Sequence, residues 1–237
     1  MNNDFKKQLI SIIGAKNLLL NDWEKKPFSN GWRYGSGTAL AVVKPGNLTE
    51  LWKVLDLCVK NDLIIIMQAA NTGLTGGSTP YGSDYDREVI IINTLRIDKI
   101  HLLNNGNEIL ALAGSTLYDL EKKLLPLGRE PHSVIGSTSI GASIVGGVCN
   151  NSGGSLVKRG PAYTEMSLYA KIDKNGKLLL INDLDINLGK SPEEILYNLE
   201  NKCFGKKDFL KSKKVSSNET YEKLVRNVNS TKPARFN

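Results

Sequence analysis

The sequence predicts an α+β fold in two parts, and three observations support this prediction. Residues 63–67 and 89–92 are short continuous apolar runs, as expected for buried strands. A second set of strand and helix patterns begins near residue 100. Each part contains a loop rich in glycine, serine and asparagine. We therefore expect four regions: a helical segment at 1–38, one subdomain at 39–100, another at 101–201, and a basic tail at 202–237.

The first part alternates between helices and strands. Apolar residues at helical spacing predict an amphipathic helix and its exit within residues 3–20. Residues 39–43 have the pattern of a buried strand that stops at Pro45. The next helix is expected to carry one apolar face, made of Leu48, Leu51, Trp52, Leu55 and Val59. The run at 63–67 is expected to be a strand covered on both faces that leads directly into the first glycine loop.

The second part has a different order of elements. Residues 108–114 predict a strand, and Thr116 can cap the helix that follows it. Residues 165–172 alternate as a half-buried strand does, and an Asn-Gly turn signal then leads to a returning strand at 178–181. Residues 191–194 form a capping box with proline at the first helical position.

Composition describes an ordinary globular protein of 237 residues, with 41% hydrophobic and 23% charged residues. No apolar run reaches the roughly 18–20 residues that a membrane-spanning helix needs. The N-terminus lacks the apolar stretch of a secretory signal. The three cysteines form no CxxC motif, so we expect a cytoplasmic location: Cys58, Cys149 and Cys203.

The net charge of +7 belongs entirely to the tail. Residues 1–201 contain 21 basic and 21 acidic residues, whereas residues 202–237 contain 10 basic and 3 acidic residues. We expect this tail to be poorly ordered and favour a solvated linker. Peripheral contact with an anionic membrane, at the cytoplasmic face of the inner membrane, is the alternative. No nucleic-acid partner is expected, because the tail lacks interleaved aromatic residues.

Several common sites are excluded by their spacing. Gly141 and Gly146 have the separation found in a phosphate-binding P-loop, but Gly147 stands where that motif requires lysine. The glycines at 35 and 37 precede a strand, which rules out the Rossmann fingerprint. His101 and His132 are too few and too isolated for a metal site, so no metal is expected. Cys149 is interpreted as a small buried residue and not as a nucleophile.

The two glycine-rich loops, residues 68–78 and 136–154, carry the functional signal. Glycine lets the backbone adopt positive φ and lets a ligand lie against the main chain. Successive exposed N–H groups in such loops form a concave anion site without lysine or arginine. Two loops of this kind indicate a ligand with an extended phosphate-bearing centre, such as a dinucleotide.

Three longer motifs, residues 67–75, 129–136 and 146–155, resemble the family of respiratory quinone-dependent D-lactate dehydrogenases. More broadly, the chain is similar to FAD-binding domains of the vanillyl-alcohol oxidase type, also called PCMH-type. The resemblance covers residues 5–200, and a further short stretch of similarity lies at 233–237. It implies two α+β subdomains, 39–100 and 101–201, with FAD between them.

The resemblance also implies which residues contact the cofactor. The first phosphate loop would be lined by Ala69, Ala70, Asn71, Thr72, Gly73, Gly77 and Ser78. Further flavin contacts would come from Gly136, Ser143 and Gly153. No catalytic base and no clamp for a substrate carboxylate can be assigned in this chain.

Members of the resembled family oxidise a 2-hydroxy acid, D-lactate, to pyruvate and pass the electrons to a quinone. They are more than twice as long as this chain, so we expect a fragment truncated before the cap domain. A completing C-terminal chain would then be a partner. The alternative is a non-catalytic remnant that binds FAD weakly or not at all and carries a basic tail.

Overall fold

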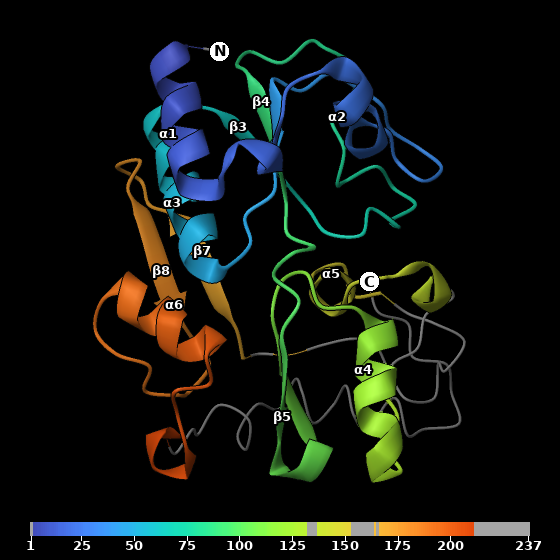
Figure 1. The fold of residues 1–237 in the computed structure, drawn as a ribbon, viewed down its shortest axis with the longest axis vertical. Helices are drawn as coiled ribbons and strands as arrows, with labels where there is room; N and C mark the ends of the chain where they lie inside the picture. The colour runs from blue at the N-terminus through green and yellow to red at the C-terminus, as the bar shows by residue number, and fades with distance from the viewer. Residues whose placement is uncertain (1, 132–136, 153–163, 165, 211–237) are drawn as a thin grey trace. The chain divides into compact units, whose positions relative to one another are not determined.

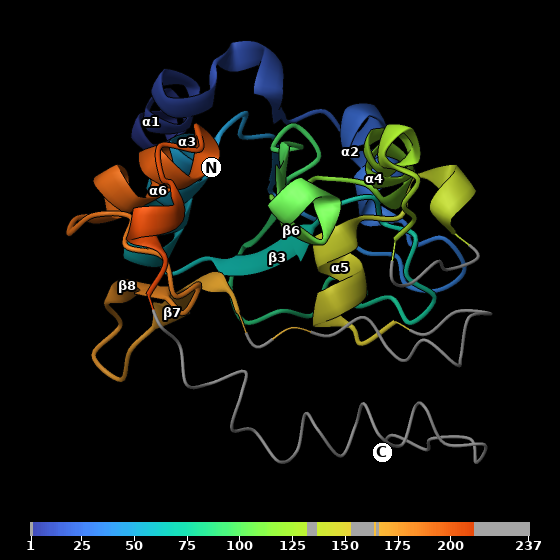
Figure 2. The same ribbon diagram turned by 90° about the horizontal axis from the view of Figure 1, so that it is seen from below.

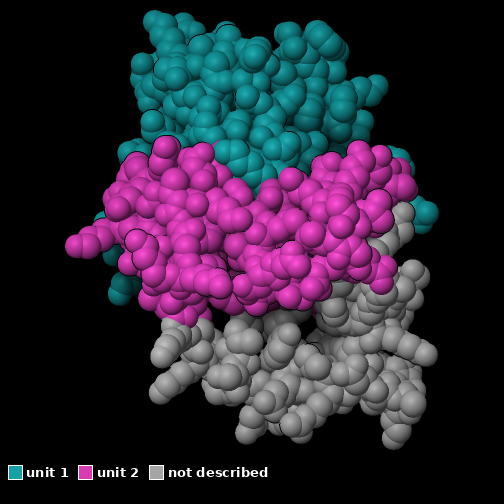
Figure 3. All heavy atoms as spheres, turned by 60° about the horizontal axis from the view of Figure 1, so that its bottom comes forward, with its two compact units in different colours: residues 1–99, 112–115, 171–179 teal, residues 100–111, 116–170, 180–237 magenta. Residues whose placement is uncertain are grey.

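A computed structural model of the chain describes residues 2–131, 137–152, 164 and 166–210. Its internal contacts divide the chain into two compact units (Figure 3). Unit 1 contains residues 1–99, 112–115 and 171–179. Unit 2 contains residues 100–111, 116–170 and 180–237. Because each unit takes residues from several separate stretches, the four regions expected from the sequence stay a prediction.

Unit 1 is built around a four-stranded sheet (Figure 1). Its strands lie in the order β1 (Leu18–Leu19), β2 (Ala41–Val43), β4 (Val89–Asn93) and β3 (Ile64–Gln68). β1 is antiparallel to β2, whereas β2, β4 and β3 are mutually parallel. Parallel β3 and β4 share a register in which Gln68 lies beside Asn93.

The two apolar runs have different positions in this sheet. β4 is central and all of its residues are buried. β3 is the edge strand, and Met67 on it is 44% exposed. The expectation that residues 63–67 are covered on both faces is therefore wrong. An edge strand has a neighbour on one side only, and a short apolar run does not reveal its place in the sheet.

Three helices belong to unit 1: α1 (Asn3–Ile13), α2 (Asp22–Ser29) and α3 (Leu48–Lys60). α1 and α3 lie side by side (Figures 1 and 2) and share one core with the sheet. The residues of α3 buried in the structure are Leu48, Val54, Leu57 and Cys58. The other residues of the predicted apolar face are only half-buried. Burial raises the pKa of the Cys58 thiol to about 12.

Unit 2 contains a hairpin of β5 (Ile100–Leu103) and β6 (Glu108–Ala111), followed by α4 (Leu117–Leu124). The Thr116 hydroxyl accepts a hydrogen bond from the Asp119 N–H, which caps α4 as predicted. The short helix α5 (Ile144–Cys149) follows later in the chain. The core of this unit contains Ile100, Leu117, Leu120, Leu124 and Ala142.

The C-terminal described part begins with a two-stranded sheet of β7 (Leu168–Ile172) and β8 (Leu178–Asn182). At their turn the Asp173 carboxylate accepts backbone hydrogen bonds from Lys177 and Asn175, which lower the pKa of Asp173. β7 is more exposed than the predicted half-buried strand, with only its first residue partly covered.

α6 (Pro192–Glu200) is the last α-helix of the described residues. It begins with the predicted cap at Ser191 and has proline at its first position. Among the described helices, none is long and apolar enough to cross a bilayer. The expectation about the tail falls mostly on residues 211–237, outside the described residues.

Candidate functional site

The phosphate loop, residues 69–78, directly follows β3. Two buried amide side chains hold it by hydrogen bonds. Gln68 Nε2 donates to the carbonyl oxygens of Phe28 and Ser78, both at 2.8 Å. Asn93 Nδ2 donates to the Ala69 carbonyl at 3.0 Å and to Gln68 Oε1 at 3.2 Å. Both ends of the loop are thus fixed to the C-terminal ends of β3 and β4.

The side chain of Asn71 connects the phosphate loop to Asn30 and to Ser78, the last residue of the loop. The φ of Asn71, 54°, lies in the left-handed region, which asparagine tolerates better than most residues. Its Nδ2 donates to the Asn30 carbonyl at 2.7 Å, and its Oδ1 accepts from Ser78 Oγ at 2.8 Å. Two of the predicted site residues, Asn71 and Ser78, are therefore in direct contact.

The backbone N–H groups of the phosphate loop have no acceptor in the described part of the chain. None of the N–H groups of residues 69–78 donates a hydrogen bond to another described residue. The carbonyls of Ala69, Gly76 and Ser78, by contrast, accept hydrogen bonds. Every residue of the loop is half-buried or exposed. A loop that uses its carbonyls for anchoring and keeps its N–H groups free is suited to bind an anion.

Two predicted glycines lie in open space. A Cβ atom added at Gly73 would meet no atom within 4 Å, and one at Gly77 would meet only Thr75 Oγ1, at 3.9 Å. Neither has positive φ. The fold itself therefore does not require glycine at these positions, whereas the close approach of a ligand to the backbone would.

A hairpin at residues 30–36, which the sequence analysis missed, packs against the phosphate loop. Asn30 and Ser36 form an isolated bridge, and the Gly31 N–H donates to the Gly35 carbonyl at 2.7 Å. A Cβ atom at Gly35, where φ is 89°, would lie 3.2 Å from the Cα of Gly76. The sequence signal that could have indicated this hairpin is the set of glycines that flank Trp32 and Tyr34.

The described part of the second loop, residues 137–152, uses its backbone differently. Its N–H donors bond within the segment, as those of residues 140–142, 147 and 150–152 do. Ser143 is the N-cap of α5, and its Oγ accepts from the Gly146 N–H at 3.2 Å. Gly136 and Gly153 lie outside the described residues. Of the three predicted residues in this loop, only Ser143 can be placed.

The structure describes His101 and Cys149, two of the residues that were considered as candidate functional groups. His101 Nε2 lies 3.2 Å from the Glu200 carbonyl oxygen, and His132 is outside the described residues. Cys149 is exposed, so its interpretation as a buried residue is wrong. It is the last residue of the six-residue helix α5. Within the described ranges, no group of histidine, cysteine and acidic residues could hold a metal ion.

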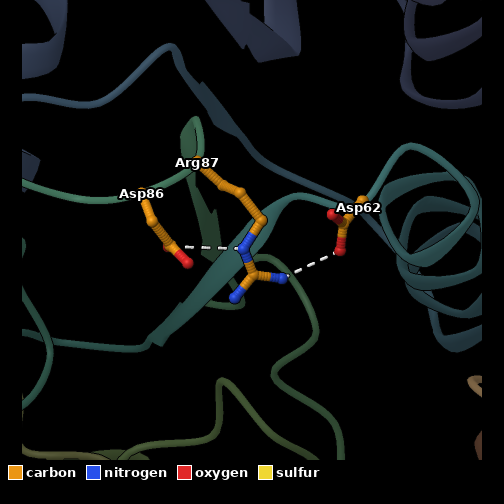
Figure 4. Close-up of polar contacts among 3 residues, drawn as sticks. All are labelled: Asp62, Asp86 and Arg87. Carbon is orange, nitrogen blue, oxygen red and sulfur yellow. Dashed lines mark hydrogen bonds and ion pairs between the residues drawn. The ribbon is translucent and has the colours of Figure 1, made fainter.

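A cavity of about 440 Å³ lies at the other end of the unit 1 sheet. Its lining includes residues 38–40, just before β2, and residues 85–89, which lead into β4. Arg87 lies on its wall, between Asp62 at 2.8 Å and Asp86 at 3.3 Å (Figure 4). These carboxylates raise the pKa of Arg87 and occupy its guanidinium group. The cavity is separate from the phosphate loop, which begins at the C-terminal end of β3.

Comparison with known sequences shows the family to which the chain belongs. Residues 39–180 match the family described as "FAD binding domain". The chain is 54% identical over 236 residues to the quinone-dependent D-lactate dehydrogenase of Escherichia coli, covering 100% of this chain and 41% of that protein. The chain spans 39–41% of the length of the three curated D-lactate dehydrogenases that it matches.

Comparison with solved structures supports the fold. Alkyldihydroxyacetonephosphate synthase superposes with a TM-score of 0.64 at 16% identity, over 80% of this chain and 39% of that one. p-Cresol methylhydroxylase superposes with a TM-score of 0.58 at 15% identity, over 80% and 36% of the two chains. These likenesses confirm the predicted α+β fold of the PCMH type.

Proposed function

Because the chain belongs to the FAD-binding domain family, we propose that it forms the flavin-binding part of an enzyme that oxidises D-lactate to pyruvate. Quinone is the proposed electron acceptor. Both reactants are taken from the names of relatives that are 46–54% identical to this chain. The family match supports FAD as the cofactor, and these relatives support a flavin oxidoreductase as the whole enzyme.

The observation that carries the proposal is that the N–H groups of residues 69–78 donate to no other described residue. A backbone N–H bonded to a charged phosphate contributes about 1.5–3 kcal/mol. Nanomolar binding requires about 12 kcal/mol. Four or five such bonds, together with burial of the flavin ring, reach that value. Because Gln68 and Asn93 already hold the loop, little conformational freedom is lost when the anion binds.

We assign the diphosphate of FAD to the phosphate loop. The residues proposed to contact it are Ala69, Ala70, Asn71, Thr72, Gly73, Gly77 and Ser78. Gly136, Ser143 and Gly153 are proposed to contact other parts of the cofactor. When bound, FAD supplies the hydride acceptor that oxidation of a 2-hydroxy acid requires. The described residues of this chain act by binding and orienting the cofactor.

The test is an absorbance spectrum of the purified chain after incubation with FAD and gel filtration. A flavin band that co-elutes with the protein near 1:1 is the expected result. Gly205→Val is a matched control for variants of the phosphate loop, because the backbone of Gly205 is extended and a Cβ there would meet no atom within 4 Å. Colourless wild-type protein would contradict the proposal and favour a remnant without cofactor.

We also propose that the protein works at the cytoplasmic face of the inner membrane. A quinone acceptor resides in the lipid, and the +7 charge of residues 202–237 would be attracted to anionic headgroups. Sedimentation with vesicles of phosphatidylglycerol is expected at low salt and should be lost as salt increases. Equal binding to neutral phosphatidylcholine vesicles would contradict an electrostatic role for the tail.

A further inference from the structure

An exposed pair of stacked tyrosines stands next to the phosphate loop. The rings of Tyr34 and Tyr81 are 6.0 Å apart between centroids and inclined by 22°. Their residues are 58% and 67% exposed, respectively. Large aromatic side chains normally bury most of their surface. Two such rings stacked in solvent therefore need an explanation other than core packing.

The ring of Tyr34 is held close to the anion site. A Cβ atom at Gly76 would lie 3.2 Å from Tyr34 Cδ1 and 3.1 Å from the Tyr34 carbonyl oxygen. Gly76, with φ of 75°, thus permits an approach that a side chain would block. The hairpin that carries Tyr34 is tied to the loop by the hydrogen bond from Asn71 to the Asn30 carbonyl.

The backbone of Tyr81 is anchored by a hydrogen bond. The Tyr81 N–H donates to the Tyr85 hydroxyl at 2.8 Å. The neighbouring Tyr81 side chain raises the pKa of Tyr34 above its usual value. Tyr34 therefore stays neutral at physiological pH. The two stacked rings form an exposed aromatic surface beside residues 69–78, whose N–H groups donate to no other described residue.

We propose that the Tyr34–Tyr81 pair binds a planar ring of the dinucleotide whose diphosphate occupies residues 69–78. This inference rests on the proposed FAD function and adds residues that the motifs did not indicate. A dinucleotide presents an anion and aromatic rings a few bonds apart, and the structure places an anion site and an aromatic surface in contact. Stacking of a base on an aromatic side chain tolerates many ring types. The adenine and the isoalloxazine are both candidates by this chemistry, and separate ligands distinguish them.

The experiment measures the affinities of the full chain for FAD, ADP, FMN and inorganic pyrophosphate by calorimetry. Tyr34→Ala and Tyr81→Ala are each expected to weaken FAD binding about ten-fold, the usual scale for one stacking contact. Tyr34→Phe keeps the ring and should bind FAD within about two-fold of wild type. Tyr197→Ala removes a 60% exposed tyrosine from α6 and serves as the matched control.

The affinity for pyrophosphate, which has no ring, shows whether the tyrosines bind a ring of the ligand or only support the phosphate loop. This affinity should be unchanged in both alanine variants, while either ADP or FMN should weaken together with FAD. Weaker binding of ADP would identify adenine as the stacked ring, and weaker binding of FMN would identify the isoalloxazine. FAD binding at wild-type strength in both variants would overturn the inference. An equal loss of pyrophosphate affinity, or an equal loss in Tyr34→Phe, would overturn it too. Wild-type protein that binds no FAD would instead contradict the proposed function.

Discussion

The two glycine-rich segments look alike in sequence and differ in the way they use their backbones. In residues 69–78 the carbonyls of Ala69 and Ser78 accept hydrogen bonds from Asn93 and Gln68, and no N–H group donates to another described residue. In residues 137–152 the N–H groups are largely consumed by turns and by α5. Glycine content alone therefore does not identify an anion site. The proposed anion site differs from the second segment in which of its peptide groups, the carbonyls or the N–H groups, form hydrogen bonds within the protein.

The difference follows from the elements that precede each segment. The phosphate loop begins at the ends of two parallel strands, where buried amide side chains can reach its carbonyls. The described part of the second segment has a helix of its own, and Ser143 caps that helix. Its contribution to a ligand would therefore come from side chains and from the few N–H groups at the start of α5.

The largest expected effect is the loss of FAD retention in Gly73→Val and Gly77→Val. A side chain at either position would block the ligand and forfeit two or more charged hydrogen bonds, so affinity should fall more than about 100-fold. Circular dichroism should be unchanged, because both positions are open in the fold. Flavin absorbance after gel filtration is the measurement. Wild-type retention in both variants, with Gly205→Val as reference, would refute the assignment of the loop.

A smaller effect is expected for Asn71→Ala. This change removes the hydrogen bonds to Asn30 and Ser78 and a residue suited to positive φ, so FAD should bind about ten-fold more weakly. Asn105→Ala is the matched control, because Asn105 has φ of 55° in a turn of unit 2. Equal FAD affinity in the two variants would show that the closure of the loop by Asn71 does not matter for binding.

Ser143→Ala tests the second segment. Loss of the cap should lower the free energy of unfolding by about 1 kcal/mol. If the proposed flavin contact exists, FAD should also bind a few-fold more weakly, on the order of one neutral hydrogen bond. Ser191→Ala removes a cap of the same 3.2 Å geometry from α6 and should lose stability only. Identical FAD affinities in the two variants would remove Ser143 from the site.

The smallest effect concerns the cysteines. Iodoacetamide at pH 8 should modify the exposed Cys149 and Cys203 and spare Cys58, whose buried thiol has its pKa raised to about 12. Because that pKa lies above the value in the unfolded chain, the contribution of Cys58 to stability should decline as the pH rises from about 9 toward 12. Mass spectrometry of the peptides gives the result. Rapid modification of Cys58 in folded protein would contradict its burial.

The sequence predicted the α+β fold class, the helix caps at Thr116 and Ser191, and the position of the phosphate loop after a strand. It could not distinguish central β4 from edge β3, because both are short apolar runs and sheet order is set by distant pairing. The hairpin at 30–36 was missed because its role depends on contacts with residues 71 and 76. Which loop keeps its N–H groups free also depends on such contacts.

Because the N–H groups of residues 69–78 have no acceptor in the described part of the chain, hydrogen exchange can report whether a ligand binds to them. An amide without an acceptor exchanges its proton with water quickly, whereas the buried ladder of β4 exchanges only when the sheet opens. Within unit 1, fast exchange is therefore expected in residues 69–78 and slow exchange in β4. Deuterium uptake in residues 69–78 therefore becomes an intrinsic gauge of ligand occupancy that needs neither a chromophore nor turnover.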